Sequence, residues 1–268
     1  MTWTRWTQIY FVSVGLFAVW VGFWGYVIPA EVANALPWSA PPLHARVIGS
    51  LYVSGTVFMF GSVFLRSKPA IDLSLAIATV WTGMLLLVSL LHWQAFDFSH
   101  TPVWFWFFAY IVFPITGGYL YVQGGAWGTV PGPGGLDLWA RRYVEVQSAV
   151  CFALAAVLFL MPGAMTTLWP WKLTPLLAQV YSGPFLAYGA AGFLFARLPG
   201  WKDAMVASLG MLTFAAFVLV ASLIHRPLFA NGGIATIIWF LGFAIANVML
   251  ALITWRASQH AIWGGLRK

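Results

Sequence analysis

Long apolar stretches almost without charge are the feature that most constrains this chain. The stretch SLAIATVWTGMLLLVSLL, residues 74–91, contains no Asp, Glu, Lys or Arg. A helix needs about 20 mostly apolar residues to cross a bilayer, and backbone polar groups in lipid must be satisfied within the segment. These stretches predict membrane-spanning helices and an all-α fold, because a membrane β-barrel would show alternating strands of about 10 residues.

The composition supports a membrane location. The 268 residues are 62% hydrophobic and only 7% charged, whereas a soluble domain is about 25% charged. The formal net charge of +7 therefore points to charged loops rather than to nucleic acid, which we do not expect as a partner. The single cysteine, Cys151, excludes an internal disulfide and a multi-cysteine metal site. The apolar N-terminal stretch is interpreted as a retained span, because a signal peptide has a shorter core.

The pattern predicts a polytopic membrane protein with eight transmembrane helices. Prolines mark most joints between them, and the Gly- and Pro-rich residues 124–140 form the longest joint. The predicted spans are 8–28, 43–65, 71–91, 102–122, 142–161, 175–196, 202–224 and 233–255.

Self-similarity predicts a tandem repeat of two four-helix units. The proposed organisation is a first repeat at 1–126, a Gly/Pro-rich cytoplasmic linker at 127–141 and a second repeat at 142–268. The phrase VSLLHWQAFDF, at 88–98, resembles VASLIHRPLF, at 220–229. At a shift of 133 residues, Pro29, Pro37, Trp38, Pro42, Ser89, His92, Phe96 and Trp106 match Pro162, Pro170, Trp171, Pro175, Ser222, His225, Phe229 and Trp239.

Four spans per repeat is an even number, so both units should cross the membrane in the same, parallel orientation. Ten of the 13 Lys and Arg residues fall on the side of the termini, and the other three are Arg46, Lys172 and Arg226. Because basic loops stay inside, we expect a multi-pass membrane protein with both termini in the cytoplasm and the lipid bilayer as its main partner.

The sequence offers little chemistry within the membrane. No Asp or Glu lies in the middle of a predicted span, which weakens ion-coupled transport because such transporters keep ionisable residues there. No nucleophile elbow, phosphate loop or H-E-x-x-H motif is present. The absence of a recognisable catalytic motif favours a non-enzymatic function.

His92 and His225, at the outer ends of equivalent spans, admit two interpretations. As a pair they would ligate a haem or a chlorophyll-type pigment. Alternatively, each side chain caps its helix by bonding the last free carbonyls. We favour capping, and no metal site or cofactor is assigned.

Arg46 is the most suggestive single residue, because its repeat mate is the neutral Gln179. One interpretation is an anion anchor at a helix N-terminus. The favoured alternative is a side chain that snorkels to the outer water, with Glu31 as an ion-pair partner. His44 is expected to be a solvated residue at a loop edge. The candidate ligand-binding residues are Arg46, Glu31, His92, His225 and Gln179.

Small residues in the second and sixth spans allow close helix approach and predict that these spans lie at the centre of the bundle. Ser50 and Ser54 show the four-residue spacing in one span, and Gly183 and Ala187 show it in the other.

The phrases LPWSAPPLHARVIGSLY and LLVSLLHWQAFDF, followed by an aromatic fourth span, resemble a group of bacterial multi-span membrane proteins without an assigned activity. The resemblance covers mainly residues 29–120 and implies an inner-membrane setting, but no catalytic residues. We expect an accessory subunit that contacts other membrane proteins, or a binder of a lipid-like molecule at the outer face. The alternatives are a facilitator or transporter of a small organic molecule and a haem- or pigment-binding protein.

Overall fold

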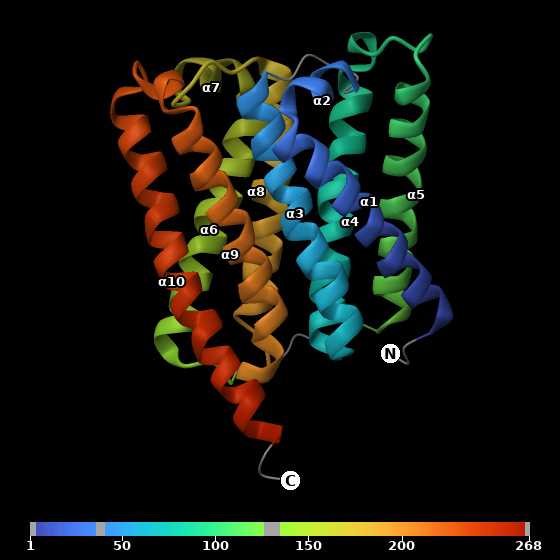
Figure 1. Cartoon of the computed structure of the whole chain (residues 1–268), viewed down its shortest axis with the longest axis vertical. Coiled ribbons are helices and arrows are strands. Elements are labelled where there is room, and N and C mark those ends of the chain that lie inside the picture. The colour runs from blue at the N-terminus through green and yellow to red at the C-terminus, as the bar shows by residue number, and fades with distance from the viewer. Residues whose placement is uncertain (1–3, 36–40, 126–134, 266–268) are drawn as a thin grey trace.

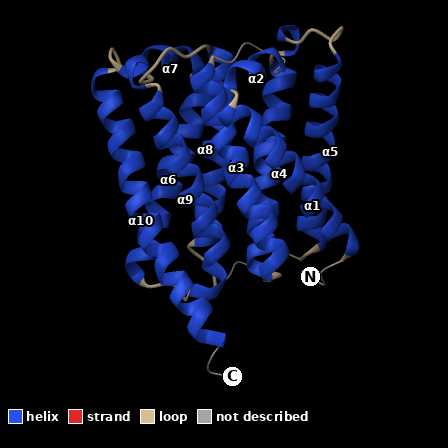
Figure 2. Cartoon of the chain, viewed as in Figure 1, coloured by secondary structure: helices blue, strands red, loops and turns tan. Residues whose placement is uncertain are grey.

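The structure, a computed structural model, describes residues 4–35, 41–125 and 135–265. It is 87% helical, and no strand occurs in the described residues (Figure 2), which confirms the all-α fold. The helices are α1 (Arg5–Val27), α2 (Pro29–Ala35), α3 (Pro42–Leu65), α4 (Lys68–Leu91), η1 (Trp93–Ala95), α5 (Thr101–Gln123), α6 (Leu138–Leu160), α7 (Pro162–Leu168), α8 (Pro175–Phe195), α9 (Trp201–Ile224), η2 (Arg226–Phe229) and α10 (Gly233–Gly265).

Seven helices are long and apolar enough to cross a bilayer, namely α1, α3, α4, α5, α6, α9 and α10. They make the chain an integral membrane protein. The remaining predicted span, the sixth in chain order, corresponds to α8, which is not among the seven although it contains no charged residue. Most of its residues are buried by neighbouring helices. A helix surrounded by protein does not need an apolar surface against lipid, and its glycines, tyrosines and Gln179 lower its hydropathy.

The helix limits agree with the predicted spans to within a few residues at most ends. Two differences are larger: α6 begins at Leu138 instead of 142, and α10 continues to Gly265 instead of ending at 255. Residues 138–141, which the sequence pattern places in the linker, are therefore helical, and most of the remaining linker, 126–134, lies outside the described residues. Pro37 and Trp38, used in the repeat alignment, also lie outside them.

The short helices α2 and α7 were not predicted, because the sequence shows only prolines at these joints. Each has seven residues and begins at a proline, Pro29 or Pro162. Proline favours the first turn of a helix, where its missing N–H is not needed. Both helices lie at the same end of the bundle (Figure 1). We call this end the α2–α7 end and the opposite end, where α1 begins and α10 finishes, the terminal end.

The order of elements in residues 4–125, the first unit, recurs in residues 135–265, the second unit. In each unit a long helix is followed by a seven-residue helix, two long helices, a 3-10 turn and a last long helix. The contacts correspond as well. Helix α1 packs on α3 as α6 packs on α8, and α4 packs on α5 as α9 packs on α10.

Four helices, α3, α4, α8 and α9, form the centre of the bundle (Figure 1). The two units meet through α3 against α9 and through α4 against α8. The sequence predicted only α3 and α8 at this centre. Their small residues make close contacts mainly with the outer helices of the same unit. Gly49 lies against the backbone of Gly25 in α1, and Gly192 lies against Ser148 in α6.

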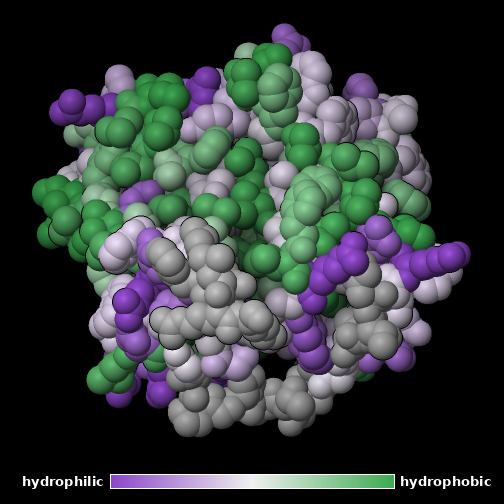
Figure 3. All heavy atoms as spheres, turned by 60° about the horizontal axis from the view of Figure 1, so that its bottom comes forward, coloured by the Kyte–Doolittle hydropathy of each residue, from purple (hydrophilic) through white to green (hydrophobic). Residues whose placement is uncertain are grey.

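The terminal end carries many of the charged side chains. Figure 3 shows hydrophilic residues gathered toward this end, whereas the flank of the bundle is mostly hydrophobic. Ion pairs at this end join Lys68 to Asp72, and Glu145 to Arg141 and Arg142. The single cysteine, Cys151, is buried.

Candidate functional site

The predicted site residues lie at the α2–α7 end. Arg46 and Gln179 sit in the first turns of α3 and α8, and both are half-buried. His92 and His225 are the C-cap residues of α4 and α9. Glu31 lies in α2 and is exposed. The structure brings four of these five residues together, in two pairs.

The first pair, which we call the Arg46 bridge, joins α3 to α9. An Nη1 atom of Arg46 lies 2.6 Å from Nε2 of His225. The Nε–H of the same guanidinium donates to the carbonyl of Tyr26 in α1, over 3.1 Å. One side chain therefore ties together α1, α3 and the C-terminal end of α9.

The second pair, which we call the Gln179 bridge, joins α8 to α4. Oε1 of Gln179 lies 2.5 Å from Nε2 of His92. The amide Nε2 of Gln179 donates to the carbonyl of Phe159 in α6, over 3.0 Å. This side chain ties together α6, α8 and the C-terminal end of α4.

The two bridges are equivalent position by position. Arg46 and Gln179 are 133 residues apart, and so are their carbonyl acceptors Tyr26 and Phe159 and their histidine partners. Each histidine is contacted by the polar residue of the other unit. The sequence predicted that Arg46 corresponds to Gln179 and His92 to His225. It did not predict that each histidine would contact the polar residue of the other unit.

Nε2 of the imidazole plays opposite hydrogen-bonding roles in the two histidines. A guanidinium has only donors, so Nε2 of His225 must accept and carry no proton. The amide nitrogen of Gln179 is already donating to Phe159, so Oε1 of Gln179 accepts and Nε2 of His92 must donate. At the same position in the fold, Nε2 of the imidazole thus accepts a hydrogen bond in the second unit and donates one in the first.

The pKa of His225 is lowered from its ordinary value of 6.5, first by burial and then by the positive charge of Arg46. The folded protein therefore disfavours the protonated ring. The stability contributed by this contact is complete above pH 6.5 and is lost as the pH falls through the lowered pKa.

Two expectations about these residues need correction. The imidazoles of His92 and His225 bond to side chains on other helices, and only their backbone N–H groups bond within their own helices, to Val88 and Ala221. Instead of the side-chain capping that we favoured, each imidazole makes a contact between helices. The partner of His225 is the charged Arg46, and that of His92 is the amide of Gln179. Arg46 does not snorkel freely, and among the described residues it forms no ion pair with Glu31.

His44 was expected to be solvated, and that expectation is wrong. Its side chain is 3% exposed. Nδ1 lies 2.7 Å from the hydroxyl of Tyr181, and the two rings stack with centroids 5.6 Å apart. The segment before α8 covers it with Trp171. The sequence could not show this, because the covering residue lies 127 positions away.

Further contacts between the units continue from this end toward the terminal end. The hydroxyl of Ser54 lies 2.5 Å from that of Tyr188 and donates to the carbonyl of Gly210 over 2.7 Å. At the terminal end, Ser67 donates to Oδ1 of Asp203 over 2.5 Å. Polar contacts therefore hold the two units together along the length of the bundle.

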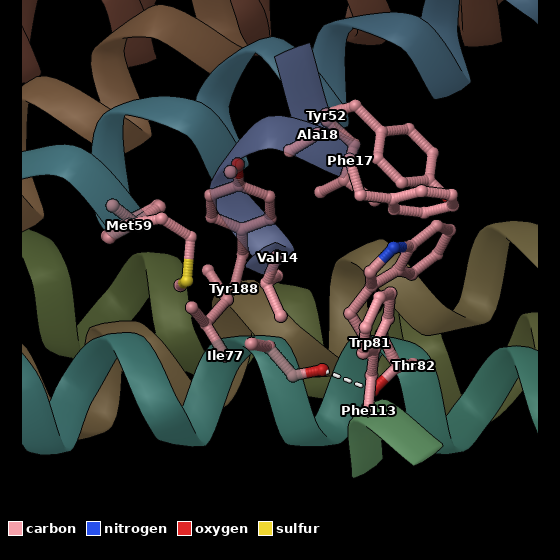
Figure 4. A pocket seen from close by; sticks show the side chains of 14 residues that line it. Val14, Phe17, Ala18, Tyr52, Met59, Ile77, Trp81, Thr82, Phe113 and Tyr188 are labelled. Atoms are coloured by element: carbon pink, nitrogen blue, oxygen red, sulfur yellow. Dashed lines mark hydrogen bonds between the residues drawn. The ribbon is translucent and has the colours of Figure 1, made fainter. Parts of the chain in front are cut away.

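An apolar cavity of about 50 Å³ lies inside the first unit. Its walls come from α1, α3, α4 and α5, and one residue of α8 closes it (Figure 4). Phe17, Tyr52 and Trp81 line one side, and Met59 and Tyr188 line the other (Figure 4). The volume exceeds the roughly 30 Å³ that one water occupies in the liquid, and an apolar cavity of this kind favours an apolar guest.

Gly55 contributes to the size of this cavity, which is larger than the apolar cavity of about 10 Å³ that Tyr181, Pro184 and Phe214 line in the second unit. A Cβ atom at Gly55 would meet only the Cβ of Ala18, at 3.8 Å. The residue 133 positions later is Tyr188, whose ring stacks on Phe214 with centroids 4.4 Å apart. The second unit thus carries a large aromatic side chain at the position where the first unit carries a glycine, and that ring is also one wall of the first unit's cavity.

The described residues contain no group of three or more His, Cys, Asp or Glu side chains that could hold a metal ion. The arrangement supports two kinds of chemistry. The bridges supply polar contacts between helices, and the cavity supplies an apolar, aromatic surface.

We compared the chain with protein-family models, with characterised proteins and with solved structures, and none of them matches. The resemblance of residues 29–120 to bacterial multi-span membrane proteins therefore stays a prediction from the sequence.

Proposed function

We propose that the chain is an eight-span protein of a bacterial inner membrane, built from two duplicated four-helix units in parallel orientation. In this proposal α8 is the eighth span, the terminal end faces the cytoplasm, and the α2–α7 end faces outward. The recurring order of elements and the equivalent bridges support the duplication. The basic residues near the terminal end support the orientation.

We propose further that the protein is a non-catalytic binder of a lipid-like apolar molecule. The observation that carries this proposal is the apolar cavity at mid-depth of α1, α3 and α4. A cavity within lipid is reached by apolar molecules more readily than by water, and its aromatic walls offer large contact surfaces. A short part of the guest, such as the end of an acyl chain, would occupy the 50 Å³.

The seam between α1 and α5 is the entrance in this proposal. These helices touch mainly through aromatic rings: the centroids of Phe17 and Phe113 are 5.4 Å apart, and those of Trp20 and Phe105 are 6.3 Å apart. Trp20 and Phe105 are exposed on the lipid-facing side. One hydrogen bond also joins these helices, from the hydroxyl of Tyr10 to the carbonyl of Phe113 over 3.3 Å, nearer the terminal end of α1. Rings on flexible side chains can turn aside, whereas the units are joined by the two bridges.

Transport and pigment binding receive less support. Passage between the units would require breaking both bridges and the contacts of Ser54. Nε2 of each paired histidine, the usual ligand atom for haem, already has a partner. A role as an accessory subunit is compatible with lipid binding, and the same experiment detects protein partners.

The test is purification in mild detergent, followed by native mass spectrometry of bound lipids, cofactors and proteins. We expect a co-purifying apolar molecule in the unmodified chain and its loss in Gly55→Leu, which fills the cavity. Gly242→Leu is the matched control, because Gly242 is exposed on α10 and a Cβ atom there would have no other atom within 4 Å.

Three results would contradict the proposal: equal retention of the molecule in both variants, no bound molecule in the unmodified chain, or a visible absorption band of haem or pigment. Both variants should show the same helix content by circular dichroism, so that loss of the guest is separated from unfolding.

A further inference from the structure

The two bridges respond differently to acid, because one uses an arginine and the other a glutamine. In the Arg46 bridge, His225 must accept through Nε2, since the guanidinium has no acceptor. Protonation of that atom removes the acceptor and places two cations at hydrogen-bonding distance. Two like charges so close repel each other strongly in a partly buried site.

In the Gln179 bridge, protonation has the opposite outcome. His92 already donates through Nε2 to the amide oxygen of Gln179. A second proton enters at Nδ1 and leaves this hydrogen bond in place. A charged donor also strengthens a hydrogen bond to a neutral acceptor.

From this geometry we propose that the Arg46 bridge is an acid-released latch between the two units. Protonation of His225 opens the contact between α3 and α9, while the equivalent contact between α8 and α4 persists. Acid at the α2–α7 end thus weakens the α3–α9 contact between the units and leaves the α8–α4 contact in place.

The surroundings of His225 leave Arg46 as its dominant charged neighbour. Helix α9 packs against α3, α4, α8 and α10, and the hydroxyl of Tyr26 in α1 donates to the carbonyl of Phe217 in α9. Near His225, α3 contributes Arg46 and His44, and Arg226 follows in η2, whereas Lys68 and Asp72 of α4 lie at the terminal end. Helix α10 has no charged residue between Gly233 and Trp255. Arg46 is the charge that lowers the pKa of His225, after burial, and Glu31 forms no ion pair with Arg46 among the described residues.

The second unit provides a control, because Arg46→Gln places in the first unit the side chain that Gln179 provides at the equivalent position of the second. In this variant a protonated His225 can donate to the new amide oxygen, so the latch should become insensitive to acid. His225→Asn is a second variant that keeps an acceptor for Arg46 and cannot be protonated in this range. The double exchange Arg46→Gln with Gln179→Arg should move the sensitivity to His92.

The test is thermal unfolding in lipid nanodiscs, where both ends of the bundle meet the same pH. Between pH 7.5 and pH 5.0 we expect the Tm of the unmodified chain to fall by about 2–4 °C more than that of Arg46→Gln or His225→Asn. All other titrating groups, such as Asp97 and His100, are common to the three proteins and cancel in the difference.

Hydrogen–deuterium exchange, corrected for the intrinsic pH dependence, locates the change. Acid should increase exchange in residues 215–232 more than in the equivalent residues 82–99. The proposal fails if the Tm of Arg46→Gln and of the unmodified chain fall equally, if the unmodified chain shows no fall, or if both segments respond alike.

Discussion

The Arg46 bridge and the Gln179 bridge occupy the same position in two units and differ in one side chain. Both link a carbonyl of the first helix of a unit to a histidine at the end of a helix from the other unit. The guanidinium adds a charge and requires a deprotonated ring, whereas the amide allows either protonation state. A shared geometry therefore does not imply a shared chemistry.

The interiors of the units differ in a similar way. Gly55 leaves room for a cavity beside α1, whereas Tyr188, at the equivalent position of the second unit, has a large ring that reaches across to Ser54. In both comparisons the backbone is maintained while a single side chain changes what the position can bind. Under the proposed duplication, such positions are where the two units can acquire different functions.

The largest expected effect comes from a close approach between the backbones of two helices, α1 and α3. A Cβ at Gly49 would lie 2.9 Å from backbone atoms of Gly25 and Tyr26, which cannot move without shifting α1. We expect Gly49→Val to destabilise the protein by about 3 kcal/mol, because it forces α1 from α3 and removes the acceptor of Arg46. The mate of Gly49 is Ser182, and Ser182→Ala serves as the mild control. Equal Tm values for the two variants would refute this account of the α1–α3 contact.

The second prediction breaks the bridges one at a time. His225→Ala leaves the charged Arg46 with the carbonyl of Tyr26 but without its histidine acceptor. We expect a loss of about 1.5 kcal/mol, reduced from the value of a fully buried pair because Arg46 is only half-buried. His92→Ala removes a neutral partner from Gln179 and should cost about 1 kcal/mol. Chemical or thermal unfolding at pH 7.5 measures both. A larger loss of stability for His92→Ala than for His225→Ala would contradict the view that the Arg46 bridge contributes more to stability than the Gln179 bridge.

The third prediction concerns a contact that is the same in both units. The indole of Trp106 donates to Ser89, and that of Trp239 donates to Ser222, each over 2.9 Å. We expect Ser89→Ala and Ser222→Ala each to cost about 1 kcal/mol, because a buried indole N–H loses this acceptor. Unfolding measurements on the two variants should agree to within about 0.5 kcal/mol, the usual error of such comparisons. A clear inequality would mean that the surroundings of the pairs differ more than the distances indicate.

The sequence predicted much of this molecule because its constraints are local. Apolar runs determine the spans, and the match of Ser89, His92 and Trp106 with Ser222, His225 and Trp239 marks equivalent positions. The contacts across the units could not be read in the same way. Nothing in the sequence places Gln179 opposite His92 or buries His44 beneath Trp171, since these contacts depend on how helices from the two halves pack.

The sequence did not predict the cavity, for a related reason. A glycine in an apolar helix is usually a site of close packing, and Gly49 fits that expectation whereas Gly55 does not. Only the positions of Ala18, Tyr188 and the rings around them show that the space beside Gly55 is empty.

The smallest expected effect is a gain. Gly55→Ala adds one methyl group at ordinary contact distance from Ala18 and replaces a glycine within a helix, which stabilises a helix by about 0.5–1 kcal/mol. The methyl group narrows the cavity without filling it, so the variant makes the first unit more like the second, which carries the large side chain of Tyr188 at this position. We therefore expect a Tm raised by about 1–3 °C in the absence of a guest, together with weaker retention of the co-purifying molecule. A lowered Tm would mean that the space beside Gly55 is already needed by neighbouring side chains, and the difference between the two interiors would then lie in packing rather than in binding.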